Sequence, residues 1–253
     1  FIACCEEHAR LRGIPAAKAT YWVCAYANRQ NELGIELAAT DPSKTPFRRA
    51  MALASGVLLI VDPLAAVFSR IWVAYELFCT LMAERGDSDG KTLDFATVHG
   101  GSAKLLADGP LFGAEGDLGG WKLKEQHRRE AEFPAELIGA GLCKRLEDAD
   151  ATMEIDKVRI LNSMAGSADL DDRAILTEKG VEARAAYGAA NAALHGRFAS
   201  AVLRLAVERG TFRCFGSGRF GDTCVDLMAT LAEYETCRRF AVSFADCPSM
   251  TDE

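Results

Sequence analysis

The stretch ALASGVLLIVDPLAAVFSRIWVAYELFCTL, residues 52–81, contains the alternation of elements from which we predict the fold. Its apolar run VLLIVD (57–62) has no polar alternation, as is typical of a strand covered on both faces of a parallel sheet. The segment before this run, 45–56, and the segment after it, about 70–84, are predicted to be helices. Helix, strand and helix follow one another closely, and this order predicts an α/β protein.

Further predicted elements lie on both sides of this stretch. We expect helices over 1–13 and 152–166 (ending at Gly166), strands over TYWVCAY (20–26) and TLDFATVHG (92–100), and an edge strand over 142–149. The strands 20–26 and 57–62 are apolar on both sides, so we expect them to be parallel neighbours with helices on both faces. The glycine-rich segment 99–120 lacks a phosphate-loop signature and is predicted to be a surface loop. We therefore predict a doubly wound, mostly parallel sheet within residues 1–166.

The composition excludes several classes of protein. The chain has 253 residues, of which 49% are hydrophobic and 26% charged, and no apolar run approaches the roughly 18 residues of a membrane-spanning helix. A net charge of -7 without a basic block argues against a protein that binds nucleic acid through phosphate contacts. The nine cysteines lie mostly in apolar contexts and the four histidines are far apart, so we expect reduced thiols, a cytoplasmic location and no metal site.

Residues 167–210 are predicted to connect the α/β domain to a further segment. The acidic stretch SADLDD (167–172) has the composition of a linker. A long helix is expected around 181–209, and its broad apolar face requires a packing partner.

Residues 211–253 have an order of strand, GSGRFG, helix and strand that also fits a dinucleotide-binding unit. However, FGSGRFGD (215–222) recurs as FADCPSMTD (244–252). A strand, turn and helix that recur after about 30 residues are typical of a solenoid. We therefore interpret 211–253 as the start of a leucine-rich-repeat-like array, and the dinucleotide-binding unit stays the alternative.

The order of predicted elements between residues 1 and 81 resembles the middle of a Toll/interleukin-1-receptor (TIR) domain. In that family an apolar strand precedes a helix that carries serine, tryptophan, glutamate and leucine. Four residues match this pattern, with one extra residue after the serine: Ser69, Trp72, Glu76 and Leu77. Val73 replaces the cysteine that plant members carry after the tryptophan. The resemblance places the family's first strand before Phe1, so we expect an N-terminally truncated TIR-like domain.

A second likeness concerns the segment TYWVCAYANRQ (20–30). It is similar to the tryptophan-bearing strand of fungal heterokaryon-incompatibility domains, which are relatives of the TIR fold.

The resemblance implies a catalytic role for Glu76. In the catalytic branch of the TIR family this glutamate cleaves NAD at the nicotinamide–ribose bond, with NAD as the substrate and no further cofactor. Glu76 is the only charged residue from Ile71 to Ala83, and desolvation by apolar neighbours would raise its pKa. Trp72 lies one helical turn earlier and is predicted to wall the same pocket. The alternative is that Glu76 marks a narrow solvent-exposed stripe on a buried helix.

Three further residues are candidates for substrate binding. Ligands of open α/β sheets bind at the carboxyl ends of the strands. Asn28 and Arg29 follow the predicted strand 20–26, and Asp62 ends the run 57–62.

Two functions therefore remain open. The first is a TIR-like signalling domain with NAD glycohydrolase activity through Glu76. The second is a noncatalytic interaction module, in which TIR-like surfaces self-associate and the repeats bind another protein.

Overall fold

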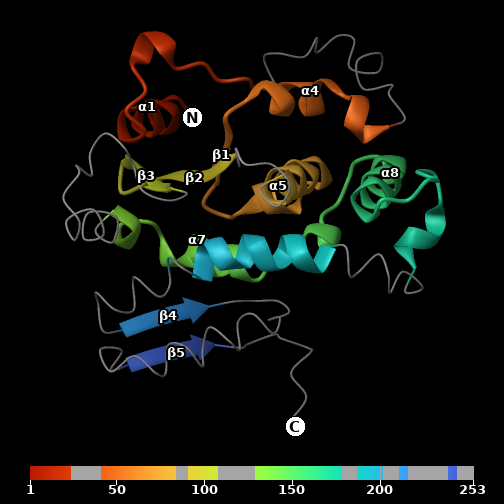
Figure 1. Cartoon of the computed structure of the whole chain (residues 1–253). Coiled ribbons are helices and arrows are strands. Elements are labelled where there is room, and N and C mark those ends of the chain that lie inside the picture. The colour runs from red at the N-terminus through yellow and green to blue at the C-terminus, as the bar shows by residue number, and fades with distance from the viewer. Residues whose placement is uncertain are drawn as a thin grey trace.

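The chain folds into a mixed α/β structure, which confirms the predicted class (Figure 1). The computed structural model describes residues 1–23, 41–83, 91–107, 129–177, 187–199, 201, 211–215 and 239–243. Its longer elements are α1 (Ile2–Leu11), α4 (Pro46–Leu53), β1 (Gly56–Ile60), α5 (Ile71–Ala83), β2 (Thr92–His99), β3 (Ser102–Leu106), α7 (Ala135–Leu142), α8 (Glu154–Ala165), a helix over 187–199, β4 (Thr211–Phe215) and β5 (Arg239–Ser243). The short 3-10 helices are η1 (Ala16–Lys18), η2 (Pro42–Lys44), η3 (Ala66–Ser69), η4 (Leu146–Asp148) and η5 (Arg173–Leu176). None of the helices in these ranges is long and apolar enough to cross a membrane.

The central sheet has three strands in the order β1-β2-β3. β1 and β2 are parallel, as expected for strands separated by a helix, whereas β2 and β3 form an antiparallel hairpin. Gly100 and Gly101 make the hairpin turn with positive φ angles of 59° and 78°, which side chains disfavour. Gly56 allows β1 to approach β2 closely, because a Cβ there would lie 2.1 Å from Oγ1 of Thr92.

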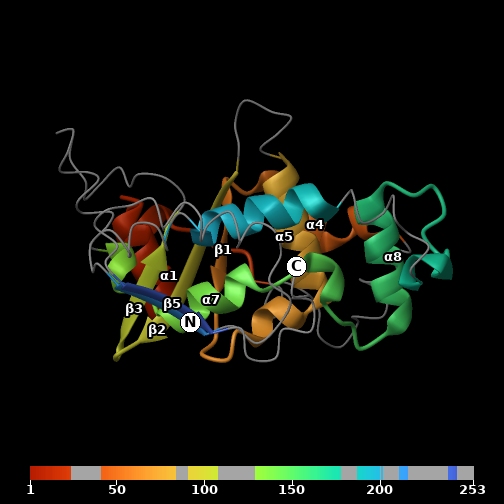
Figure 2. The same ribbon diagram turned by 90° about the horizontal axis from the view of Figure 1, so that it is seen from below.

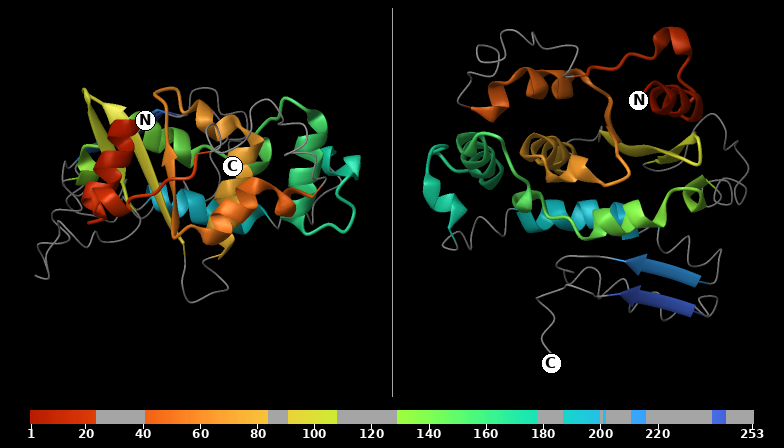
Figure 3. Two further views of the ribbon diagram at one scale, coloured as in Figure 1. Left: turned by 90° about the horizontal axis from the view of Figure 1, so that it is seen from above. Right: turned by 180° about the vertical axis from the view of Figure 1, so that it is seen from behind.

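Helices lie on both sides of this sheet. In Figure 1 and Figure 3, α1 and α4 lie above it, α7 and the helix over 187–199 lie below it, and α5 lies beside β1. Figure 2 shows the lower layer from below, where the helix over 187–199 crosses β1 and α5. α5 therefore occupies the level of the sheet, next to the strand edge that β2 does not cover.

The main core lies between the sheet, α5 and the lower helices. Phe95 of β2 and Phe198 of the helix over 187–199 are both 1% exposed, with ring centroids 4.6 Å apart. Gly141 of α7 admits the Phe198 ring, since a Cβ at this glycine would lie 2.4 Å from a ring carbon. The core thus extends past residue 166 and includes the helix that the sequence assigned to a connector.

The start of α5 is fixed by a backbone bridge to a distant segment. The Asp150 N–H donates to the carbonyl of Ser69 at 2.8 Å, and the Ile71 N–H donates to the carbonyl of Asp150 at 2.8 Å. The bridge therefore supplies a partner for one of the N–H groups that the first turn of a helix leaves unsatisfied.

The predicted strand 20–26 is wrong in its described part. Residues 20–23 form no strand, 24–26 lie outside the described residues, and the described partner of β1 is β2 rather than 20–23. The aromatic side chains explain the difference. Tyr21 bonds to α1 through its hydroxyl, and Trp22 packs edge-on against Phe47 of α4 with centroids 5.5 Å apart. These contacts hold residues 20–23 against α1 and α4 and not within the sheet.

Two further expectations are corrected. The predicted edge strand 142–149 is the end of α7 followed by η4. Asn191 of the helix over 187–199 fixes η4, because its side chain accepts from the Leu146 N–H at 3.0 Å and donates to Glu147 at 2.8 Å. The glycine-rich segment predicted to be a loop contains β3, whose Leu105 and Leu106 are buried, and its later part lies outside the described residues.

Other expectations are confirmed. β1 and β2 lie within the predicted strands 57–62 and 92–100 apart from Gly56, and α8 ends at Gly166, which has a φ of 73°. β4 and β5 pair in parallel, an arrangement common to both interpretations of the C-terminal segment. The repeat itself stays a prediction, because 216–238 and 244–253 lie outside the described residues.

Candidate functional site

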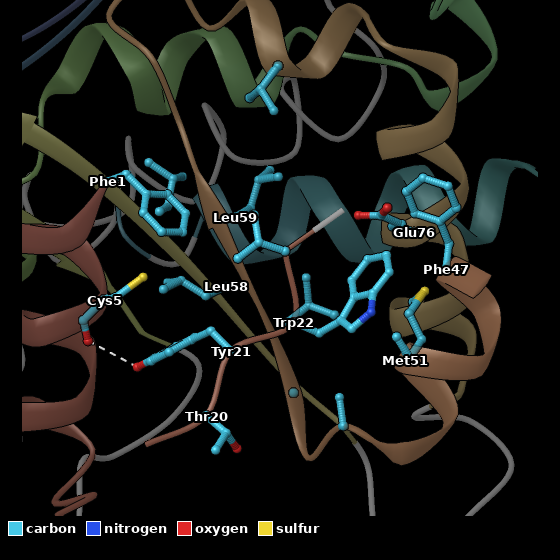
Figure 4. Close-up of a pocket in the computed structure, with 17 residues that line it drawn as sticks. Phe1, Cys5, Thr20, Tyr21, Trp22, Phe47, Met51, Leu58, Leu59 and Glu76 are labelled. Atoms are coloured by element: carbon cyan, nitrogen blue, oxygen red, sulfur yellow. Dashed lines mark hydrogen bonds between the residues drawn. The ribbon is translucent and has the colours of Figure 1, made fainter. Parts of the chain in front are cut away.

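Glu76 faces a cavity of about 350 Å³ that runs along β1 (Figure 4). All five residues of β1 line this cavity, residues 20–23 border it from the helical layer, and Phe47 and Met51 of α4 close it beside α5. In Figure 4 the carboxylate of Glu76 points from α5 toward β1. The one acidic residue of an otherwise apolar helix therefore points into a cavity.

The environment of Glu76 favours its neutral form. Burial raises the pKa of Glu76 to about 7, and the positive charge of Arg70 opposes this shift only in part. Within the described residues its carboxylate has no hydrogen bond or ion pair, and the Thr80 hydroxyl donates to the backbone oxygen of Glu76 at 2.8 Å and not to the carboxylate. A half-buried carboxylate of this kind is available to a ligand, since no group in the described part of the chain has to release it.

Aromatic rings form the wall next to Glu76. Trp22 and Phe47 line the cavity, and Trp72 stacks on the far side of Phe47 with centroids 5.4 Å apart and an interplanar angle of 17°. Trp72, a predicted wall residue, thus supports the wall from behind and does not itself line the cavity. Trp22 lines the cavity instead of Trp72. The sequence signal for Trp22 was its position in a segment predicted to be a strand near the site.

The outer edge of β1 contributes backbone groups to the same cavity. The ladder with β2 includes Thr92 N–H to Ser55 carbonyl at 3.3 Å and Val61 N–H to Ala96 carbonyl at 2.7 Å. Because alternate residues of a strand face opposite edges, this register turns the N–H and C=O groups of Gly56, Leu58 and Ile60 away from β2. No hydrogen bond to these groups is found in the described part of the chain.

The end of the cavity near α1 is held by a buried charged cluster. Asp94 of β2, whose side chain is 1% exposed, accepts two hydrogen bonds from Arg12 and contacts His8 Nε2 at 3.0 Å. His8 Nδ1 lies 2.7 Å from the Tyr21 hydroxyl, which donates to the Cys5 carbonyl at 3.0 Å. Tyr21 and Cys5 line the cavity, so this cluster fixes the position of its wall.

The cavity offers no activated thiol or phenol in its described wall. Burial raises the pKa of the Cys5 thiol, and nearby Cys4 raises it further. Burial likewise raises the pKa of Tyr21. Both groups are therefore neutral near pH 7, and Glu76 is the group with a pKa suited to a change of charge there.

The other predicted binding residues are not brought to the cavity by the described structure. Asp62 follows β1, but its carboxylate accepts from the N–H groups of Leu64 at 3.0 Å and Val67 at 3.1 Å. Although partial burial works in the opposite direction, backbone donors including Ala66 and Val67 lower the pKa of Asp62, as suits a residue that caps a turn. Asn28 and Arg29 lie outside the described residues.

Among the described residues, no group of three or more His, Cys, Asp or Glu side chains could hold a metal ion. Comparison of the chain with known protein families, curated proteins and solved structures finds no significant match.

Proposed function

We propose that the chain contains a TIR-like, doubly wound α/β domain that cleaves NAD between nicotinamide and ribose, with Glu76 as the catalytic residue. The observation that carries this proposal is the Glu76 carboxylate, which has no described partner and points into an aromatic-walled cavity of about 350 Å³. A cavity of this size is in the range of small-molecule sites. Its aromatic wall suits a planar pyridinium ring, and its carboxylate suits the positive charge of that ring.

The proposed chemistry needs one well-placed negative charge. The bond between ribose C1′ and the pyridinium nitrogen breaks, and its electron pair returns to the ring, so nicotinamide leaves as a neutral molecule. Glu76 stabilises the oxocarbenium-like centre that develops at C1′. Water then adds to C1′ and releases a proton, which gives ADP-ribose. The leaving group needs no general acid, because it is already cationic in the substrate.

A noncatalytic interaction module is the second candidate. Two apolar side chains support it, because Leu53 at the end of α4 and Leu64 after β1 are 90% and 88% exposed. Self-association would remove such side chains from water. The parallel pair β4 and β5 is also compatible with a repeat array that binds a protein partner.

Nicotinamide release tests the enzyme proposal. Glu76→Gln keeps the size of the side chain and removes its charge, so we expect turnover of NAD to fall at least about 100-fold. Glu154→Gln is the matched control, because Glu154 lies on α8 with its side chain 62% exposed, and it should retain wild-type turnover. Equal turnover in Glu76→Gln and wild type, or none in wild type after self-association is promoted, would overturn the proposal and favour the interaction module.

A further inference from the structure

The outer edge of β1 carries hydrogen-bonding groups that the proposed reaction does not use. We infer that the N–H and C=O groups of Leu58 bind the carboxamide of the substrate, so that the site selects a nicotinamide ring over a nicotinic acid ring. This inference rests on the proposed function, because it assigns the part of NAD that lies against β1. It adds a determinant of specificity that consists of backbone atoms and leaves no trace in the side-chain pattern.

The hydrogen-bonding pattern of Leu58 matches a primary carboxamide. A residue that faces outward from a strand edge presents its N–H donor and its C=O acceptor side by side, as it would to a neighbouring strand. A carboxamide offers one acceptor and one donor in the same arrangement. The Leu58 N–H can therefore donate to the carboxamide oxygen while the carboxamide NH₂ donates to the Leu58 carbonyl. Both groups of Leu58 are without a partner in the described part of the chain.

The position of Leu58 along the strand is the reason for choosing it. It is the middle one of the three outward-facing residues, between Gly56 and Ile60, and all three line the cavity. Its side chain packs with the cluster beneath α1 and lies on the side of β1 near Cys5 and Tyr21, whereas Glu76 lies on the other side of the strand (Figure 4). The edge also lies on the side of β1 where α5 carries Glu76 (Figure 4).

The same geometry orients the rest of the substrate. With the carboxamide on β1, the pyridinium ring lies toward the wall formed by Trp22 and Phe47, and the bond to ribose lies toward Glu76. A nicotinic acid ring has a carboxylate in place of the amide. It lacks the NH₂ donor, and its negative charge would lie near the Leu58 carbonyl and Glu76. A site built around a donor and acceptor pair strongly rejects an analogue that cannot complete it.

A proline substitution tests the donor directly. Leu58→Pro removes an N–H that points away from β2, a position at which a strand edge tolerates proline, and it also replaces the leucine side chain. Leu58→Ala is the matched control, because it shortens the side chain and keeps the N–H. The readouts are binding of free nicotinamide and nicotinic acid by NMR titration, and the relative kcat/KM for NAD and its deamidated analogue with nicotinic acid.

We expect wild type and Leu58→Ala to bind nicotinamide at least about 10-fold more tightly than nicotinic acid, and Leu58→Pro to lose most of this preference. Equal binding of the two rings by wild type overturns the inference, as does failure of nicotinamide to bind or an unchanged preference in Leu58→Pro. If Leu58→Pro does not fold, the preference of wild type alone decides.

The outcomes separate the two proposals. Cleavage of NAD and its deamidated analogue at equal kcat/KM would overturn the carboxamide contact and leave Glu76 catalysis standing. Selective nicotinamide binding that depends on the Leu58 N–H, together with unchanged NAD turnover in Glu76→Gln, would support the contact and overturn the role of Glu76.

Discussion

At the scale of single residues, the catalytic role proposed for Glu76 is connected with a cost in stability. An ionised carboxylate without a described partner in an apolar cavity loses hydration that nothing in the described structure replaces. The native state therefore favours the protonated form more than water does, and burial raises the pKa of Glu76 to about 7 for this reason. A positively charged group of a substrate would stabilise the ionised carboxylate and lower the pKa of Glu76.

The first prediction concerns stability as a function of pH. Between about pH 4.5 and 7 the native state holds a proton on Glu76 that the unfolded state has lost, so the free energy of unfolding falls as the pH rises through this window. Glu76→Gln removes this fall and should be more stable than wild type at pH 8 by about 1–3 kcal/mol. Urea denaturation of both proteins at pH 5 and pH 8 measures the difference. The same dependence on pH in both proteins would contradict it.

The second prediction concerns turnover of NAD. The value of kcat/KM reports the ionisation of the free enzyme. Since the proposed mechanism uses the carboxylate form of Glu76, kcat/KM should rise about tenfold per pH unit below pH 7 and level off above it. Initial rates of nicotinamide release between pH 5 and 9 provide the profile. A profile that falls over this range would show that the protonated form of some group is needed instead.

At the scale of elements, β1 positions the candidate site, because it is a strand of the central sheet and also forms a wall of the cavity. Its close contact with β2 depends on Gly56, where even the smallest side chain would meet Thr92. The chain thus begins β1 with a residue of poor strand propensity for a steric reason.

The third prediction follows from this contact. Gly56→Ala must displace Thr92, so we expect the free energy of unfolding to fall by about 2 kcal/mol, with a lower midpoint of thermal unfolding. Gly188→Ala is the control, because Gly188 lies in the helix over 187–199 with no atom within 4 Å of an added Cβ. There, alanine should leave stability unchanged or raise it by up to about 1 kcal/mol. A similar effect of both substitutions would refute the steric account.

The elements differ in how far the sequence predicts them. β1 and β2 are apolar runs and α8 ends at a glycine, so local patterns suffice for them. The sequence does not predict β3, because its five residues include Lys104 and follow two glycines, a composition typical of a loop. The composition of 20–23 favours β structure, whereas contacts of Tyr21 and Trp22 with distant helices decide the conformation of this segment.

At the scale of the whole molecule, a buried ionic cluster attaches α1 to the sheet. His8 comes from α1, Arg12 follows its last residue, and Asp94 comes from the middle strand. The side chains of Arg12 and His8 are largely buried, at 11% and 13% exposure. The cluster therefore sets the distance between α1 and the sheet, and with it the width of the cavity between them.

The fourth prediction concerns this attachment. Asp94→Asn leaves the buried charge of Arg12 without its carboxylate, so we expect the free energy of unfolding to fall by about 3 kcal/mol. Glu154→Gln removes one partner of an exposed pair with Arg173 and should cost less than about 1 kcal/mol. Denaturant unfolding measures both. An equal, small effect of the two substitutions would show that the buried cluster contributes no more than a surface pair.

At this scale too, the sequence predicts only part of the candidate site. Glu76 could be found from its isolation in an apolar helix. The cavity could not, because its walls come from residues 20–23, α4 and β1, whose packing depends on contacts distant in sequence. Backbone groups such as those of Leu58 carry no sequence signal at all, since every residue except proline has them.

The bridge between Asp150 and the start of α5 has a consequence for amide hydrogen exchange. The first N–H groups of a helix usually exchange quickly, because they lack a partner within the helix. The Ile71 N–H instead exchanges only after the strand-like contact at Asp150 opens, and the Asp150 N–H is released by the same event. The two amide protons, distant in sequence, should therefore exchange at a common rate as one opening unit. Any motion that turns Glu76 away from β1 by rotating α5 would have to break this unit first.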